Sequence, residues 1–78
     1  MPEVLLFAQA REIAGRPSTT AVGETVQDVL SDLNNRFGQS FAEIVAISRV
    51  WVNEEPATPG QVVSEGDEVA ILPPVSGG

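Results

Sequence analysis

The sequence predicts a single α+β domain in which one main helix covers a mixed sheet of four or five strands. Three observations support this prediction. The chain has only 78 residues, it contains one clear amphipathic helix, and short β-prone segments lie on both sides of that helix. A chain of this length has room for one hydrophobic core. Packing a single helix across a sheet is a common two-layer solution for such a core.

Two strands are predicted before the main helix. Residues 3–10, EVLLFAQA, are apolar and rich in Val, Leu and Phe, as is typical of a strand. Residues 11–15 favour a helical turn that ends at Gly15, because Pro17 prevents its continuation. Residues 18–22, STTAV, are β-prone. The simplest arrangement pairs them with the first strand as a hairpin.

The main helix is predicted over residues 25–37. Thr25 is a favourable N-cap residue, and Asp28 can complete a capping box while its charge complements the helix dipole. Gly38 stands where a glycine commonly ends a helix. Apolar residues at helical spacing form one stripe along the segment: Val26, Val29, Leu30, Leu33 and Phe37.

The second half of the chain supplies the remaining strands. Residues 41–47 are compatible with a short helix or with the start of a strand. Residues 49–53, RVWVN, alternate as a strand does, and residues 53–56 have the composition of a turn. Short strands are predicted over residues 61–63 and 68–72. A hairpin, a helix and then further strands is the order of the β-grasp, or ubiquitin-like, fold.

The sequence divides into a β-grasp domain, residues 1–72, and a flexible C-terminal tail, residues 73–78. The two prolines that open the tail stop sheet pairing and stiffen the chain into an extended exit. The tail ends in Gly-Gly. At an average Gly content of about 7%, this ending arises by chance in roughly 0.5% of chains. The position of the pair, after a diproline and a β-grasp pattern, indicates that the terminus has a function.

The composition excludes several kinds of site. The chain has no Cys and no His, which removes disulfides, thiolate metal sites, a Cys nucleophile and the commonest general base. Lys and Tyr are absent as well. An independent enzyme would therefore depend on Asp, Glu, Ser, Thr and Arg, so we expect no catalysis by this chain alone and no bound metal.

The charge and hydropathy limit the partners and the location. A net charge of −7 would repel the phosphate backbone of nucleic acids. The apolar run over residues 4–8 is too short for a signal peptide, and no segment approaches the roughly 20 apolar residues of a membrane span. We expect a cytoplasmic protein that binds neither nucleic acid nor membrane.

The C-terminal carboxyl group is the group best suited to covalent chemistry. Its pKa is about 3.5, so it is ionised at neutral pH and is a poor acyl donor. Attack on the α-phosphate of ATP would give an acyl-adenylate, which sulfur or nitrogen nucleophiles can open. The terminus must then reach into another protein's active site. Gly77 and Gly78 suit that task because they have no side chain and accept unusual backbone angles.

Both ends of the chain resemble the small subunits of molybdopterin synthase. The start resembles theirs in Leu6-Phe7-Ala8, Arg11-Glu12 and Gly15. The end resembles their C-terminal motif in Gly66-Asp67-Glu68-Val69-Ala70 and in Pro73-Pro74-Val75-Ser76-Gly77-Gly78. The likeness in element order extends through the whole chain.

This resemblance implies a sulfur carrier without a permanently bound cofactor. An E1-like enzyme would consume ATP to adenylate Gly78, and a sulfur donor would convert the adenylate to a thiocarboxylate. The tail would then enter the large synthase subunit and give its sulfur to cyclic pyranopterin monophosphate. Two small subunits on a dimer of large subunits are the implied assembly. The inserted residues would be Pro73, Pro74, Val75, Ser76 and Gly77.

A partner-binding patch is predicted beside the tail. Alternation puts Leu72 on the more polar face of the last strand, with Phe7 exposed nearby. The resemblance places partner contacts in similar positions, and it adds Pro56. Burial in the core is the alternative for Phe7 and Leu72, and a solvated charge is the alternative for Arg11, which could pair with a partner carboxylate. Trp51 is expected to serve packing.

Other functions remain open from the sequence. A carrier for thiamine thiazole or cysteine synthesis would use the same thiocarboxylate, and genetic rescue would identify the product restored. A ubiquitin-like modifier would join Gly78 to lysines of other proteins and produce a ladder of conjugates. For a plain interaction domain, deletion of the two terminal glycines would have no effect.

Overall fold

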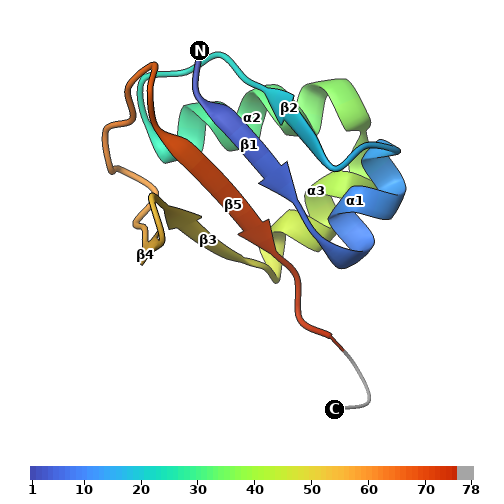
Figure 1. Cartoon of the computed structure of the whole chain (residues 1–78). Helices are drawn as coiled ribbons and strands as arrows, with labels where there is room; N and C mark the ends of the chain where they lie inside the picture. The colour runs from blue at the N-terminus through green and yellow to red at the C-terminus, as the bar shows by residue number, and fades with distance from the viewer. Residues whose placement is uncertain (76–78) are drawn as a thin grey trace.

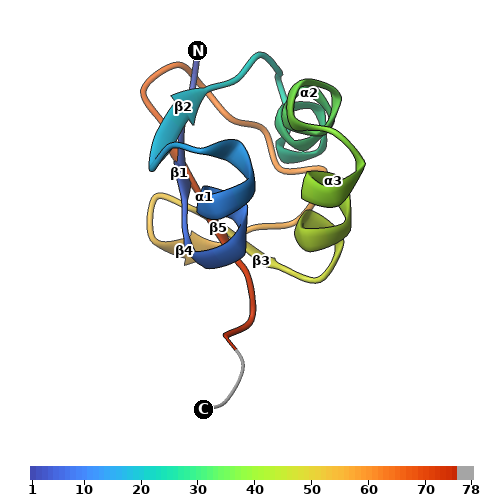
Figure 2. The ribbon, with the colours of Figure 1, turned by 90° about the vertical axis from the view of Figure 1, so that its right-hand side faces the viewer.

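Eight short elements make up the fold, and the computed structural model describes them within residues 1–75 (Figure 1). They are β1 Glu3–Leu6, α1 Ala8–Ala14, β2 Ser18–Thr20, α2 Val26–Phe37, α3 Gln39–Ala46, β3 Arg49–Val52, β4 Glu55–Pro56 and β5 Glu68–Leu72. The strands form one sheet in the order β2-β1-β5-β3-β4. Among these described strands, only β1 and β5 pair in parallel. Helices α2 and α3 cover one face of the sheet (Figure 2), as the predicted α+β fold requires.

The predicted first strand extends too far along the sequence. β1 ends at Leu6, Phe7 has an extended backbone, and Ala8 begins α1 with a φ angle of 49°. Ala and Gln form helices better than strands, and Ala10 is fully buried in the core. The prediction that Gly15 ends this helical segment is confirmed, because it adopts the left-handed conformation with a φ angle of 75°.

The predicted hairpin is confirmed, although its second strand is shorter than expected. β2 pairs antiparallel with β1, and Leu5 lies opposite Ser18. The amide of Leu6 donates to the carbonyl of Pro17 at 2.9 Å. β2 ends at Thr20, which leaves a short edge strand at this side of the sheet.

Helix α2 forms where the sequence predicts it. Thr25 and Asp28 complete the capping box, since each side chain accepts a hydrogen bond from the other residue's amide. Gly38 ends the helix with a φ angle of 92°, and α3 begins at the next residue. The ambiguous segment 41–47 is therefore helical up to residue 46. The buried residues of the two helices are Val26, Val29, Leu33, Phe41 and Val45.

The turn after β3 is tighter than the predicted turn over residues 53–56. Asn53 and Glu54 have φ angles of 50° and 70°, which is the pattern of a two-residue type I′ hairpin turn. Pro56 consequently lies in the edge strand β4, opposite Trp51. The strand predicted over residues 61–63 is reduced to one isolated bridge between Val62 and Thr25.

The core lies between the sheet and the helices. Its sheet side consists of alternate residues from three strands, Val4, Leu6, Val52, Val69 and Ile71. No helix of residues 1–75 covers the opposite face of the sheet (Figure 2). Within residues 1–75 no helix is long and apolar enough to span a membrane.

Candidate functional site

The C-terminal segment leaves the domain from the centre of the sheet. β5 lies between β1 and β3, and the chain that follows it exits at the end of the sheet opposite the N-terminus (Figure 1). Pro73 is buried, whereas Pro74 and Val75 are exposed. The described chain thus leaves the surface at Pro74, within the segment predicted as the tail. Predicted tail residues 76–78, including the reactive Gly78, lie outside the described residues.

Helix α1 lies beside this exit. Pro74 and Val75 line a shallow hollow together with three α1 residues, Ala8, Gln9 and Glu12. The side chain of Val75 is 77% exposed, so it does not anchor the segment in the core. The exit is thus bordered by the first turns of α1 and remains accessible to another molecule.

A row of mostly apolar residues crosses the open face of the sheet. The strand registers place Leu5 beside Ala70, Ala70 beside Trp51, and Trp51 beside Pro56. Pro56 is exposed and the other three are half-buried. We call these four residues the open-face row. Trp51, expected to serve packing, lies outside the hydrophobic core and on a surface where a partner can reach it.

The predicted interface residues lie at two places, one at the tail end of the sheet and one at its far edge. Phe7 is 41% exposed at the end of β1, and Leu72 is half-buried on the open face, opposite Arg49. Arg11 is exposed on α1, and its amide donates to the carbonyl of Phe7 at 3.3 Å. These residues gather at the tail end of the sheet. Pro56 lies at the far edge, and the open-face row connects it to the centre.

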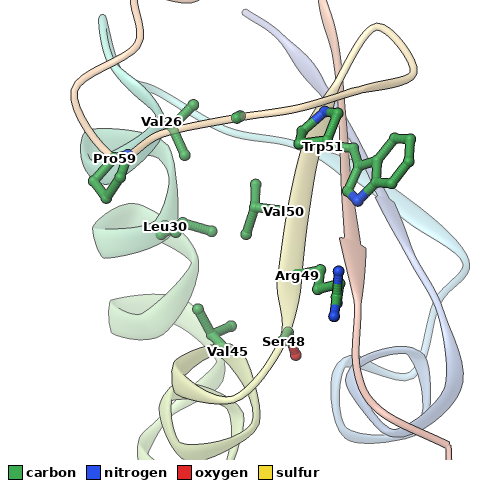
Figure 3. A pocket seen from close by; sticks show the side chains of 10 residues that line it. Val26, Leu30, Val45, Ser48, Arg49, Val50, Trp51 and Pro59 are labelled. Atoms are coloured by element: carbon green, nitrogen blue, oxygen red, sulfur yellow. The ribbon is translucent and has the colours of Figure 1, made fainter.

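A second apolar surface lies on the other side of β3. Val50 points from β3 toward α2, whereas Arg49 and Trp51 point away from it (Figure 3). The resulting groove has a volume of about 370 Å³, and its apolar lining includes Val26, Leu30, Val45, Val50, Ala57 and Pro59. Ser48 also lines the groove, and its hydroxyl donates a hydrogen bond to the carbonyl of Ile44 at 2.6 Å. The groove is lined for packing rather than for acid–base chemistry.

Apart from Glu12, which lines the hollow beside the tail exit, the best hydrogen-bonded carboxylate lies far from that exit. Asp67 has a lowered pKa because Asn53 and the amide of Ser64 donate hydrogen bonds to it, and it lies just before β5, at the opposite end of that strand. Among residues 1–75 no three acidic side chains are placed to hold a metal ion together. The described part of the chain therefore has an open sheet face that a partner can contact, and its C-terminal segment points away from the body of the domain (Figure 1).

Comparison with known proteins agrees with this geometry. The profile of the ThiS family matches residues 4–78. The molybdopterin synthase sulfur carrier subunit of Arabidopsis thaliana is 42% identical over 79 residues, which cover 97% of this chain and 81% of the plant protein.

Solved structures show the same fold. The small archaeal modifier protein 1 of Methanosarcina acetivorans has a TM-score of 0.86 and 29% identity, with 97% of this chain and 94% of that chain covered. A chain in the crystal structure of the BexX/CysO complex of Amycolatopsis orientalis has a TM-score of 0.84 and 28% identity. The match covers 100% of this chain and 100% of that chain. The expected ubiquitin-like fold is confirmed by these likenesses.

Proposed function

This chain belongs to the ThiS family, and on that premise we propose that it is the sulfur carrier subunit of a molybdopterin synthase. The observation that carries the proposal is the likeness to the plant sulfur carrier subunit over 97% of the chain. The exit of the described chain at Pro74, beside an uncovered sheet face, supports it. The chain would act with a large subunit and would not be a catalyst by itself.

The sulfur would travel on the carboxyl group of Gly78. A carboxylate oxygen attacks the α-phosphate of ATP and displaces pyrophosphate, which leaves an acyl-adenylate. A sulfur nucleophile at the oxidation level of hydrosulfide then attacks the carbonyl carbon, the C–S bond forms, and AMP departs with the oxygen of the broken C–O bond. The product is a thiocarboxylate. When the sulfur forms a C–S bond to cyclic pyranopterin monophosphate, water attacks the carbonyl carbon of Gly78, the C–S bond to that carbon breaks, and the terminus returns to a carboxylate.

The large subunit would contact the open face and receive the tail. Phe7, Leu72 and Pro56 would be contact residues, and Arg11 would pair with a partner carboxylate. An exposed apolar surface beside a reactive segment is typical of a docking site. Replacing Phe7 or Leu72 by Arg should weaken binding to the large subunit while the melting temperature stays near that of the wild type. A collapse of stability would place that residue in the core instead.

The proposal is tested by the mass of the intact protein. We expect incubation with ATP, an E1-like activating enzyme and a sulfur donor to exchange one oxygen for one sulfur. The same incubation of a variant that lacks Gly78 should leave its mass unchanged. If a demonstrably competent activating enzyme produces no shift in the wild type, the chain is not a sulfur carrier.

A ubiquitin-like protein modifier is the second candidate function. The likeness to an archaeal protein named as a modifier, at a TM-score of 0.86, favours it, and an acyl-adenylate could equally be opened by the lysines of other proteins. Tagged chain expressed in its host would then give a ladder of conjugates that depends on Gly78. Restoration of molybdopterin in a carrier-deficient strain, without such a ladder, would favour the sulfur carrier. Rescue of thiamine or cysteine synthesis would indicate another carrier pathway.

A further inference from the structure

The charged side chains are divided unevenly between the two ends of the sheet. At the end where β1 begins, Glu3 lies opposite Glu68, and the amide of Glu3 donates to the carbonyl of Asp67 at 3.1 Å. Glu65 pairs with the N-terminal amine at 3.3 Å. The turn that contains Glu54 follows Val52, which lies opposite Val69 at this same end. We call this the acidic end.

The start of α2 extends the acidic end. The amide of Val63 donates to the carbonyl of Glu24, and Asp28 accepts from the amides of Glu24 and Thr25. Asp32 accepts from the amide of Val22, beyond the end of β2. The acidic end carries nine carboxylates and one arginine, so its side chains sum to −8. The side chains of the whole chain sum to −7. These residues are Glu3, Glu24, Asp28, Asp32, Arg36, Glu54, Glu55, Glu65, Asp67 and Glu68.

The opposite end, where the chain exits, carries the other three arginines. Arg11 and Arg16 line one hollow of about 480 Å³ between α1 and the segment before β2. Arg49 lies on the open face, opposite Leu72. Glu12 and Glu43 of α1 and α3 are the carboxylates here, so the side chains at this end sum to +1 within the total of −7.

The three arginines at the tail end have no ion-pair partner among residues 1–75, whereas Arg36 at the acidic end pairs with Asp32 at 3.6 Å. Arg11, Arg16 and Arg49 are all exposed. Their fixed forks of donors match carboxylates in a bidentate geometry. Arg11 and Arg16 lie on the α1 side of the tail end and Arg49 lies on its open-face side, while Glu12 is the charged residue that lines the hollow beside Pro74 and Val75.

We infer that the partner surface that receives the tail carries carboxylates opposite Arg11, Arg16 and Arg49. The inference rests on the proposed function, since it presupposes a protein that receives the tail. Such a surface attracts the tail end and repels the acidic end, so the chain approaches it tail first. β5 separates the two ends by about 16 Å, from roughly 3.3 Å per residue. That is twice the Debye length of about 8 Å at physiological salt. The charges of a partner surface therefore interact mainly with the end of the chain that lies nearer to them.

Stopped-flow binding to the large molybdopterin synthase subunit tests the inference. The variants are Arg11→Gln, Arg16→Gln and Arg49→Gln, singly and combined. Electrostatic steering changes association rates by about 10- to 1,000-fold. We therefore expect the combined variant to associate roughly tenfold more slowly at low salt, and this difference should shrink as salt is added. Thermal melts verify that the variants fold.

The matched control neutralises three carboxylates at the acidic end, Glu24→Gln, Glu54→Gln and Glu65→Gln. A tail-first approach predicts little change in the association rate of this control. An unchanged or faster rate for the combined arginine variant would overturn the inference, and so would an effect of equal size and opposite sign in the control, because net charge alone would then explain both.

The inference and the proposed function fail in distinguishable ways. If the wild-type chain binds the large subunit and delivers sulfur, but the arginine variants bind as fast as it does, only the inference is wrong. If the wild-type chain does not bind the large subunit at all, both are wrong.

Discussion

Asp67 holds the segment before β5 through bonds that suit its ionised form. Its carboxylate accepts from the Asn53 side chain at 2.9 Å and from the amide of Ser64 at 2.8 Å. These bonds lower the pKa of Asp67, and the Asn53 contact has the larger effect. A group with a depressed folded pKa stabilises the fold above its unfolded pKa, and this contribution is lost as the pH falls through the folded value.

We therefore expect Asp67→Asn to destabilise the chain at pH 7 but to have little effect below the folded pKa. Urea unfolding at both pH values measures the difference between the variant and the wild type. Asn53→Ala is the partner control, and its effect should be non-additive with that of Asp67→Asn. A difference that stays constant as the pH falls would show that the carboxylate charge is not responsible.

Trp51 and Val52 are neighbours in sequence that face opposite sides of the sheet. Trp51 belongs to the open-face row, whereas Val52 is 4% exposed in the core. We expect Trp51→Ala to weaken binding to the large subunit at least tenfold, as an aromatic anchor at an interface would. Val52→Ala should cost about 2 kcal/mol of folding stability. Calorimetric binding and urea unfolding separate the two effects, and the reverse pattern would contradict this assignment of faces.

Helix α2 protects the edge of the sheet as well as the core. The outward-facing carbonyl of Thr20 accepts from Arg36, and the amide of Val22 donates to Asp32 at 3.0 Å. Arg36 and Asp32 are one turn apart and 3.6 Å from each other. Unpaired backbone groups on an edge strand invite pairing with another chain, and this pair of side chains occupies two of the groups that a second copy could use.

The variant Arg36→Leu should expose this edge. We expect a loss of about 1 kcal/mol of stability, because the bond is charge-assisted but exposed, together with self-association that increases with protein concentration. Sedimentation velocity over a range of concentrations measures the second effect. Arg16→Leu is the matched control, since that exposed arginine bonds no strand edge among residues 1–75. Equal association of both variants would indicate that the added leucine, not the open edge, is the cause.

The elements differ in how far the sequence could predict them. α2 was predictable because its cap, its apolar stripe and its terminal Gly38 are local signals. The boundary between β1 and α1 was not predictable. It depends on the positive φ angle of Ala8, a conformation that is uncommon for alanine and has no signal in the sequence. Segment 41–47 was ambiguous because it is apolar, and tertiary packing decides it: the rings of Phe37 and Phe41 lie 5.1 Å apart.

Alternation along β1 and β5 was enough to place Phe7 and Leu72 near the exit of the chain. The alternation of Trp51 with Val50 and Val52 indicated that Trp51 faces the other side of the sheet from them. The strand register that sets Trp51 beside Pro56 could not be read from the sequence. The division of charge depends on topology in the same way. Glu3 and Glu68 are distant in sequence, and only the parallel pairing of β1 with β5 brings them to one end.

On the proposed function, the whole molecule combines a docking body with a terminus that must reach a distant site. Deleting Val75 and Ser76 while keeping both glycines would shorten the reach by about 7 Å, at roughly 3.3–3.6 Å per residue. The open face and the three tail-end arginines would remain unchanged. We therefore expect near-normal binding to the large subunit but at least about a hundredfold slower sulfur transfer, because small misplacements of reacting groups carry large rate penalties.

Single-turnover sulfur transfer from the purified thiocarboxylate measures that rate, and equilibrium binding is measured on the same samples. The matched control replaces Val75 and Ser76 by alanine, which keeps the length and should keep most of the rate. If the shortened chain transfers sulfur as fast as this control, reach is not what the tail provides. If the control is as slow as the shortened chain, the two side chains themselves, rather than the length they supply, are needed inside the partner.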